Sequence, residues 1–158
     1  MDRGDIDLLV ALDSDPEVMR FLTGRPSTRD EVRQSIEESG GSRWVAFHCA
    51  TDEFVGWFGL EPGPDHAYEI GYRLARRWWG QGLASEGTQA LVDAAFSTLG
   101  ALRVTAQTMA VNQRSRRVME RCAMTHVRTF HLEWADPLPG TEHGEVEYEL
   151  KLETWRAT

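Results

Sequence analysis

The segment of residues 66–100 restricts the fold of this chain more than any other part of the sequence. Residues 66–74 alternate in character with the period of two that is typical of a β-strand. One face of that strand would carry Tyr68, Ile70, Tyr72 and Leu74, and the other Ala67, Glu69, Gly71 and Arg73. Residues 83–98 then place small and apolar side chains three and four positions apart, which indicates a helix that ends at Gly100. A strand, a glycine-containing turn and a helix in this order predict an α/β or α+β domain.

The turn between this strand and this helix has the pattern R-x-x-G-x-G, formed by Arg77, Gly80 and Gly82. A turn of this kind exposes several backbone N–H groups and directs the positive end of the helix at one point. Glycine permits positive φ angles and a close approach of the ligand to the backbone. The pattern therefore favours a bound anion, most often a phosphate. Trp78 and Trp79 are expected either to hold the turn in place or to line the ligand groove.

Three phosphate-binding loops compete for this segment. A Walker A loop requires Gly-Lys-Ser/Thr, whereas this chain has Gly82-Leu83-Ala84 and its single lysine is Lys151. A dinucleotide-binding loop requires a third glycine at the position of Ser85, and it belongs to the first strand–helix turn rather than to the middle of a chain. The third alternative is a loop for the pyrophosphate of coenzyme A, and we favour it over a nucleotide-binding protein of another class.

The remaining segments predict further helices and strands. Thr28 followed by Glu31 fits a capping box at the start of a helix. Expected helices cover residues 6–12, 15–22, 28–39 and 113–122, and expected strands cover residues 43–50, 54–60, 103–109, 127–134 and 145–152. No repeat or long linker divides the chain of 158 residues, so we expect one domain over residues 1–158.

Composition excludes several classes of protein. The formal net charge of −8 argues against a nucleic-acid binder, which needs a basic surface. No apolar run approaches the ~18 residues of a membrane span, and the acidic N-terminus is unlike a signal peptide, so we expect a cytoplasmic protein that does not bind membranes. The two cysteines form no C-x-x-C pair, and the five histidines show no H-x-x-x-H spacing. We therefore expect no metal site.

The segment EIGYRLARRWWGQGLASEGTQALVDAAF, followed by VNQRSRRVMERCAM and GEVEYEL, resembles the GNAT N-acetyltransferase superfamily. Within it, the sequence is most similar to the branch of the ribosomal-protein N-terminal acetyltransferases. The resemblance covers about residues 13–155. It implies a central, mostly antiparallel mixed sheet flanked by about four helices. Two middle strands, residues 66–74 and 103–109, would splay apart to admit the pantetheine arm of acetyl-CoA.

The resemblance also implies which residues bind the cofactor. Main-chain amides would hold the CoA pyrophosphate across Arg77, Trp78, Trp79, Gly80, Gln81, Gly82 and Leu83. Asn112 matches the family asparagine that contacts the cofactor arm, although an asparagine there is also a natural helix N-cap. Four arginines would face the CoA phosphates or form a solvated surface: Arg76, Arg114, Arg116 and Arg117.

The sequence departs from the family pattern in three places. Many relatives carry a tyrosine at the position of Met119 as the acid for the thiolate, whereas the branch named above offers a serine, here Ser115. Ser115 could equally cap the helix that starts nearby. Relatives read Gly-Phe or Gly-Met where this chain has Ala123-Met124. The family's first strand has no counterpart here, so we expect a shortened start or a sheet edge covered by another element or by a second copy in a homodimer.

Acetyl transfer needs a base that removes a proton from the ammonium form of the acceptor. Glu69 is the candidate base because it lies opposite the apolar face of its strand, near the predicted loop. It could instead be an exposed strand carboxylate with no chemical role. Cys122 lies on an apolar helix face and Cys49 within a predicted strand, so an acyl-cysteine intermediate is disfavoured.

Two functions stay open at this point. The favoured one is an N-acetyltransferase that transfers acetyl from acetyl-CoA to a primary amine. The alternative is a catalytically inactive acyl-CoA-binding sensor or regulatory module, which Met119 favours and Ser115 disfavours. The acceptor is a protein N-terminus, a small-molecule amine or a polyamine. The acidic strand of Glu145, Glu147 and Glu149 favours a cationic acceptor through electrostatic attraction.

Overall fold

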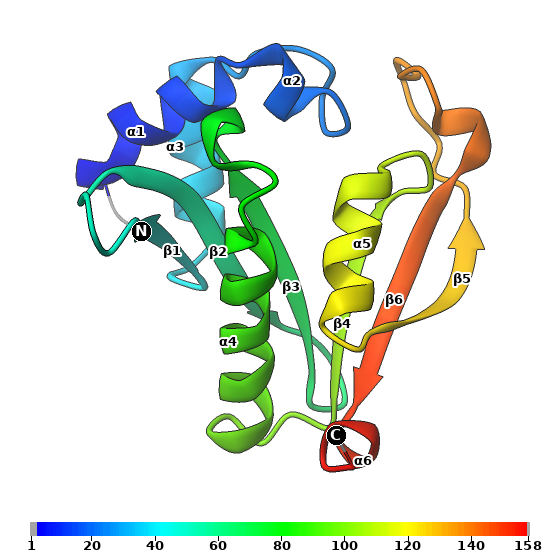
Figure 1. Ribbon diagram of the computed structural model, residues 1–158. Coiled ribbons are helices and arrows are strands. Elements are labelled where there is room, and N and C mark those ends of the chain that lie inside the picture. The colour runs from blue at the N-terminus through cyan, green and yellow to red at the C-terminus, as the bar shows by residue number, and fades with distance from the viewer. Residues whose placement is uncertain (1–2, 158) are drawn as a thin grey trace.

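The computed structural model describes residues 3–157, and one six-stranded sheet organises them (Figure 1). The strands are β1 (Arg43–Phe47), β2 (Phe54–Pro62), β3 (Ala67–Leu74), β4 (Arg103–Met109), β5 (Thr125–Phe130) and β6 (Glu145–Lys151). The α-helices are α1 (Ile6–Asp13), α2 (Pro16–Met19), α3 (Arg29–Glu38), α4 (Leu83–Ser97), α5 (Gln113–Arg121) and α6 (Leu152–Trp155). Short 3-10 helices are η1 (Arg3–Asp5), η2 (Arg76–Trp78) and η3 (Thr141–His143).

The strand order is β1-β2-β3-β4-β6-β5, and β3–β4 is the parallel pair in a sheet whose other neighbours are antiparallel. This pair is short, because Ala67–Glu69 of β3 meets Arg103–Thr105 of β4 and pairing then stops. Beyond these residues the two strands diverge toward their C-terminal ends (Figure 1). The mostly antiparallel mixed sheet with splayed middle strands is therefore confirmed.

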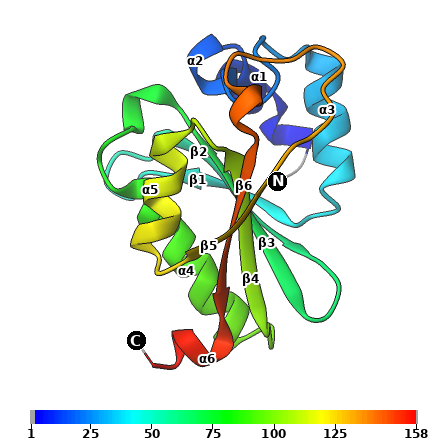
Figure 2. The ribbon, with the colours of Figure 1, turned by 90° about the vertical axis from the view of Figure 1, so that its right-hand side faces the viewer.

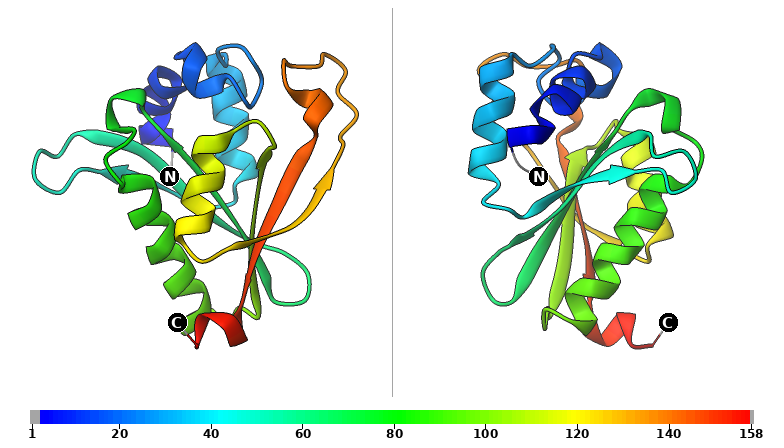
Figure 3. Two further views of the ribbon diagram at one scale, coloured as in Figure 1. Left: turned by 45° about the vertical axis from the view of Figure 1, so that its right-hand side comes forward. Right: turned by 90° about the vertical axis from the view of Figure 1, so that its left-hand side faces the viewer.

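Helices cover the two faces of the sheet unequally. In the right-hand view of Figure 3, α4 and α5 lie on one side of the strands, and α1 and α3 lie on the other side near one end. The core under α4 and α5 contains Ile70, Val92, Ala95, Val104 and Tyr148, all of them buried. A separate apolar cluster joins the N-terminal helices to β2: Ile6, Leu9, Leu12, Val18, Val32, Ile36 and Trp57. None of the helices in the described residues is long and apolar enough to span a bilayer.

Two connections lie close together at one end of the sheet. The segment between β5 and β6 extends toward the α2–α3 connection (Figure 2). Gly24 has a φ of 68°, and a Cβ built on it would clash with the Leu138 side chain. The backbone conformation therefore favours glycine at this point, and the absence of a Cβ lets the Leu138 side chain lie close.

Several element boundaries differ from those that the sequence predicts. β1 ends at Phe47 rather than at residue 50, because the amides of Thr51 and Asp52 donate to the carbonyl of His48 and form a turn. β5 runs over Thr125–Phe130 rather than residues 127–134, since its pairing with β6 ends where Phe130 meets Glu145. α2 covers only Pro16–Met19 of the predicted 15–22, and α6 was not predicted. With these two helices of four residues each, the described residues form six α-helices where the resemblance implied about four.

Helix α4 approaches the sheet at Gly87. A Cβ at this residue would clash with three carbons of the Phe58 ring in β2, so the helix can lie this close only with glycine here. The Thr28–Glu31 capping box of α3 is confirmed: Glu31 N donates to Thr28 Oγ1 at 3.3 Å, and Thr28 N donates to Glu31 Oε2 at 2.7 Å.

We expect Gly87→Ala to lower the melting temperature, although alanine is the better helix former by about 1 kcal/mol. Overpacking of a core typically costs about 1–3 kcal/mol, which offsets or exceeds that gain. Thermal unfolding of Gly87→Ala, Phe58→Leu and the double variant measures the coupling. A smaller loss in the double variant than the sum of the single losses is expected, and strict additivity would show that Gly87 and Phe58 do not compete for space.

Candidate functional site

The two splayed strands lead directly into the segments that carry the expected site residues. β3 ends at Leu74 and continues through η2 into the turn before α4. β4 ends at Met109 and continues into Asn112, which begins α5. The glycine turn and the start of α5 thus stand at the ends of the two strands that diverge (Figure 1). Residues far apart in the sequence therefore meet around one gap in the pairing of the sheet.

The turn before α4 presents a row of unused backbone amides. Trp78 N donates to Ala75 O at 2.9 Å and Trp79 N to Arg76 O at 3.1 Å, so these two amides are occupied. The amides of residues 80–85 donate to no carbonyl within the described residues. They lie at the N-terminus of α4, a helix of 15 residues whose dipole is positive there. This arrangement can bind an anion such as a phosphate group.

Glycine is required in this turn for its conformation. Gly80 has a φ of 77° and Gly82 a φ of 86°, in the region that L-residues rarely adopt. A Cβ at either position would meet no atom within 4 Å. The space above the turn is therefore open toward solvent, and a ligand can approach the amides directly.

Side chains of the turn tie it to the strands beneath. Trp78 is buried; its Nε1 donates to Phe54 O at 2.9 Å, and its ring stacks on His48 with the centroids 4.9 Å apart. Arg77 Nη2 donates to the same carbonyl at 3.1 Å. Of the two roles expected for the tryptophans, Trp78 has the one that holds the turn in place.

Trp79 links the turn to β3 and to α5. Its Nε1 donates to Leu74 O at 2.8 Å, and the guanidinium carbon of Arg114 lies 4.7 Å from the centre of its ring. Because Arg114 belongs to α5, this cation–π contact crosses the gap between the splayed strands. Gln81 turns back on the loop, where its Nε2 donates to Arg77 O at 2.9 Å.

Asn112 is the N-cap of α5. Its Oδ1 accepts a hydrogen bond from Ser115 N at 3.3 Å, and its Nδ2 donates to Thr108 Oγ1 at 3.0 Å. One amide hydrogen of Asn112 has no partner among the described residues and can donate to a ligand.

The arginines near these residues differ in their surroundings. Arg116 is committed to the protein interior, since its Nε donates to Tyr148 Oη at 3.1 Å and its Nη1 to Ala110 O at 3.1 Å. Arg76 pairs with Asp15 at 3.2 Å and remains largely exposed. Arg114 and Arg117 are exposed on α5. Arg76, Arg114 and Arg117 are therefore the members of the predicted set that can still turn toward an anion.

Ser115 has a partner that the sequence did not reveal. The Tyr72 hydroxyl lies 2.8 Å from Ser115 Oγ and 3.2 Å from Ser115 O, so the phenol reaches from β3 to α5 across the gap. Burial raises the pKa of Tyr72 to about 12, against the opposing effect of the hydrogen bond with Ser115. Tyr72 therefore stays protonated and can act as a hydrogen-bond donor at neutral pH.

The sequence pattern assigned Tyr72 to the apolar face of β3, and the structure keeps it there with its hydroxyl at the edge of the core. The available signal was Met119, which is buried and leaves the site without the phenol that many relatives place on this helix. A tyrosine on the neighbouring strand was the natural candidate for a replacement.

Glu69 is the last residue of β3 that pairs with β4. Its side chain reaches solvent on the face opposite α4 and α5. Burial by surrounding atoms raises its pKa above the ordinary value, and the negative charges of Glu61 and Glu147 raise it further. A carboxylate with a raised pKa is better suited to accept a proton near neutral pH than an ordinary one.

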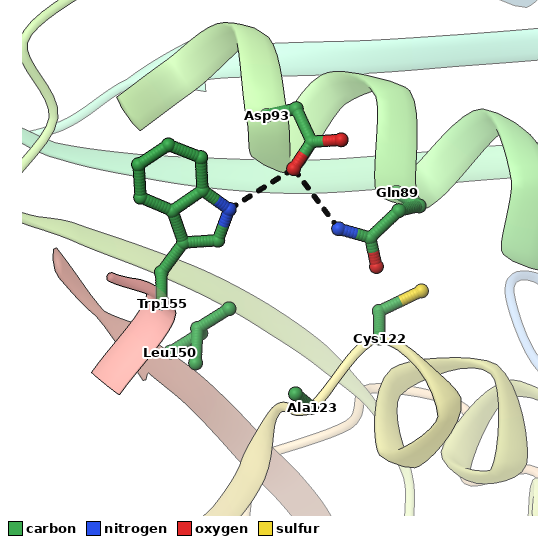
Figure 4. Close-up of a pocket in the computed structure, with 6 residues that line it drawn as sticks. All are labelled: Gln89, Asp93, Cys122, Ala123, Leu150 and Trp155. Atoms are coloured by element: carbon green, nitrogen blue, oxygen red, sulfur yellow. Dashed lines mark hydrogen bonds between the residues drawn. The ribbon is translucent and has the colours of Figure 1, made fainter. Parts of the chain in front are cut away.

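A cavity in the structure lies away from these residues. It has a volume of about 390 Å³ and is lined by Gln89, Asp93, Cys122, Ala123, Leu150 and Trp155 (Figure 4). None of the expected site residues lines it. Asp93 Oδ1 accepts hydrogen bonds at 3.0 Å from both Gln89 and Trp155. These polar side chains of the cavity lining are therefore hydrogen-bonded to one another.

Neither cysteine has the surroundings of a nucleophile. Cys122 is buried, and burial raises the pKa of its thiol, which disfavours the reactive thiolate. Cys49 is exposed in the turn after β1 rather than within a strand. Within the part of the chain that the structure describes, no group of three or more His, Cys, Asp or Glu side chains is arranged to hold a metal ion.

Comparison with known proteins identifies relatives over most of the chain. A family model described as an acetyltransferase (GNAT) domain matches residues 1–125. FsC-acetyl coenzyme A-N(2)-transacetylase of Aspergillus fumigatus is 40% identical over 94% of this chain and 70% of that protein. An N-acetyltransferase of Bacillus licheniformis, p20, which is described as uncharacterized, is 33% identical over 68% of this chain and 66% of that protein.

Solved structures share the fold. An acetyltransferase (GNAT family) of Bacillus anthracis has a TM-score of 0.81 at 23% identity, covering 97% of this chain and 92% of that one. Spermidine N-acetyltransferase of Vibrio cholerae, in complex with CoA and spermine, has a TM-score of 0.80 at 17% identity, covering 99% and 95%. At these identities the likeness concerns the fold.

Proposed function

The chain belongs to the GNAT acetyltransferase family, and on that premise we propose that it transfers acetyl from acetyl-CoA to a primary amine. The observation that carries the proposal is the gap between β3 and β4, which has free amides at one strand end and paired hydroxyls across it. An anionic cofactor and a reactive thioester need these two features.

Acetyl-CoA fits the gap in the following way. The amides of residues 80–85 bind the pyrophosphate, and the exposed side chains of Arg76, Arg114 and Arg117 can turn toward it. The pantetheine arm enters between β3 and β4, where each strand has main-chain groups not used by the other. The remaining amide hydrogen of Asn112 can donate to this arm.

The chemistry is a direct transfer. The amine nitrogen forms a bond to the thioester carbonyl carbon, the carbon–sulfur bond breaks, and the nitrogen loses a proton while the departing thiolate gains one. Glu69 accepts the proton of the acceptor ammonium group, so that a neutral amine can attack. No acyl-enzyme is needed, in agreement with the buried, protonated Cys122 thiol.

Two hydroxyl groups are available to the thiolate. Ser115 and Tyr72 share a hydrogen bond, and both stay protonated at neutral pH. The pKa of Tyr72, at about 12, lies well above the ~8.5 of an ordinary thiol, so the phenol stabilises the thiolate by hydrogen bonding and does not give its proton up completely. The pair thus stands in for the tyrosine that Met119 replaces, and it supports the branch with a serine at this position.

The acceptor is proposed to be a cationic amine. The relative from A. fumigatus is named for transfer to the N(2) nitrogen of FsC, and the V. cholerae structure is that of a spermidine acetyltransferase. The net charge of −8 attracts a positive charge at long range, and the sheet face that carries Glu69 also carries Glu145, a carboxylate without an ion-pair partner among the described residues. A protein N-terminus remains an alternative acceptor.

A homodimer is also proposed. β1 is an edge strand, and its exposed apolar side chains include Trp44 and Phe47. Uncovered edge strands of this kind tend to pair with another strand. A second copy of the chain would supply one.

The function is tested by calorimetric titration with acetyl-CoA, with ATP and NAD as controls, followed by an amine screen that detects free thiol. Saturable binding of acetyl-CoA alone and thiol release with an amine are expected. Binding without thiol release from any amine would favour the inactive sensor, and a preference for ATP or NAD would exclude the proposed cofactor.

We expect Gly82→Ala to raise the dissociation constant of acetyl-CoA about tenfold or more, because the turn loses amide hydrogen bonds to the pyrophosphate worth roughly 1.5–3 kcal/mol each. Gly100→Ala is the matched control: Gly100 has a φ of 70° and equally open surroundings, but it lies at the other end of α4. Calorimetric titration of both variants with acetyl-CoA provides the comparison. Equal losses of affinity in the two variants would contradict the assignment of the turn before α4 as the pyrophosphate site.

Glu69→Gln should lower kcat/KM for the acceptor by about 10²–10⁴-fold while the affinity for acetyl-CoA stays unchanged. In the wild type, activity is lost as pH falls through the raised pKa of Glu69, because the protonated carboxyl cannot accept a proton. Glu61→Gln removes a like charge and should move this acid limb to lower pH. An acid limb that stays in place in Glu61→Gln, or full activity of Glu69→Gln, would remove Glu69 from the mechanism.

Ser115→Ala and Tyr72→Phe should each lower kcat by roughly tenfold to a hundredfold, as expected for the loss of a hydrogen bond to a charged atom worth about 1.5–3 kcal/mol. Because the hydroxyls act as a pair, the double variant should lose much less than the product of the single effects. Steady-state kinetics of the three variants provides the comparison. Independent, multiplicative effects would show that the two groups do not act together.

A further inference from the structure

The carboxylates on the Glu69 face of the sheet come with cationic partners. The pairs are Glu61 with Arg43 at 2.8 Å, Glu147 with Arg128 at 2.6 Å, Glu149 with Lys151 at 3.5 Å, and Asp13 of α1 with Arg73 at 2.6 Å. Each of these charges is neutralised within the fold and needs no ligand.

Two carboxylates on this face, Glu69 and Glu145, have no such partner. Neither side chain forms an ion pair or a hydrogen bond with any described residue. Glu145 is the more unusual of the two, because it is only 7% exposed and its Oε1 is buried without a partner. A buried carboxylate without a cation or donor costs free energy, and burial accordingly raises the pKa of Glu145.

The strand register places both carboxylates on one face. Glu69 pairs with Thr105 of β4, and Glu145 of β6 pairs with Met109, four residues further along β4. Residues opposite each other share a face, and so do residues an even number apart on one strand. Glu145 therefore lies on the same face as Glu69. Along the strands, Glu145 is level with the wide end of the gap, whereas Glu69 is level with its narrow end.

The separation of the two glutamates follows from sheet geometry. Four residues along β4 span about 13 Å, and two strand spacings add about 10 Å sideways, so the two Cα atoms are roughly 16 Å apart. Flexible glutamate side chains shorten the distance between the carboxylates. One acceptor molecule with two positive groups far apart therefore has the length to span both carboxylates.

We propose that Glu145 is a specificity-determining residue that binds a second ammonium group of the acceptor while Glu69 receives the amine that reacts. The acceptor class is then a diamine or polyamine with widely spaced nitrogens. This inference rests on the proposed function and deepens it. It also accounts for the retention of a buried carboxylate that the fold leaves without a partner.

The test compares 1,8-diaminooctane with n-octylamine as acceptors, which differ only in the second amine. For Glu145→Gln, kcat/KM should fall about tenfold or more with the diamine and stay unchanged with the monoamine, since one partner of a buried charge pair is lost. Glu149→Gln is the matched control on the same strand and face, where Lys151 already neutralises the carboxylate. A series from 1,4-diaminobutane to 1,12-diaminododecane should show its length preference in the wild type and lose it in Glu145→Gln.

Equal losses with both acceptors, or no loss with either, would overturn the role of Glu145 and leave the acetyltransferase intact. The Glu145→Gln melting temperature should equal or exceed that of the wild type at neutral pH, whereas a structural role would lower it. If the wild type binds acetyl-CoA but releases no thiol with any amine, the proposed function fails instead. Calorimetric binding of 1,8-diaminooctane to the CoA complex then still tests Glu145, with weaker binding expected only in Glu145→Gln.

Discussion

The short parallel pairing of β3 with β4 is the constraint on which the site depends. Three residue pairs join the two halves of the sheet, and each strand then follows its outer antiparallel neighbour, β2 or β6. Side chains bridge the gap where the backbone does not: Tyr72 with Ser115, and Arg114 with Trp79. The fold thus leaves main-chain groups unpaired in its centre, which is costly unless water or a ligand satisfies them. The extended arm of a cofactor is a natural partner because it can lie along both strands.

Charge is distributed so that each side of this gap suits one substrate. The net charge of −8 repels a polyanionic cofactor at long range, so its affinity must come from local groups, namely the free amides of residues 80–85 and the exposed arginines near them. On the opposite face, ion pairs neutralise most carboxylates, whereas Glu69 and Glu145 have no such partner among the described residues. Under the proposed function, the sheet would separate an anion site from a cation site, and the two substrates would meet in the gap between the strands.

Local patterns in the sequence predicted the parts of the structure that local physics determines. Helix α4, its glycine turn and the capping box at Thr28 depend on residues close together in the chain, and all three were correctly predicted. The end of β5 was wrong, because it is set by pairing with β6 across a long connection and not by β-propensity. For the same reason, the sequence pattern assigned Tyr72 only to the apolar face of its strand and did not distinguish Glu145 from Glu147 and Glu149. The role of each depends on a partner, present or absent, that only the tertiary structure defines.

Several locally unfavourable features of this protein lie where a ligand could provide the missing interaction. Positive φ angles at Gly80 and Gly82, unused amides at the start of α4 and the unpartnered carboxylate of Glu145 all lie around the wide end of the gap. Each would be improved by a simple change if stability alone mattered, such as an apolar residue at position 145. Sites where stability is sacrificed are commonly those where a ligand supplies the missing partner. A phosphate at the amides and an ammonium group at Glu145 would complete these interactions from opposite faces of the same sheet.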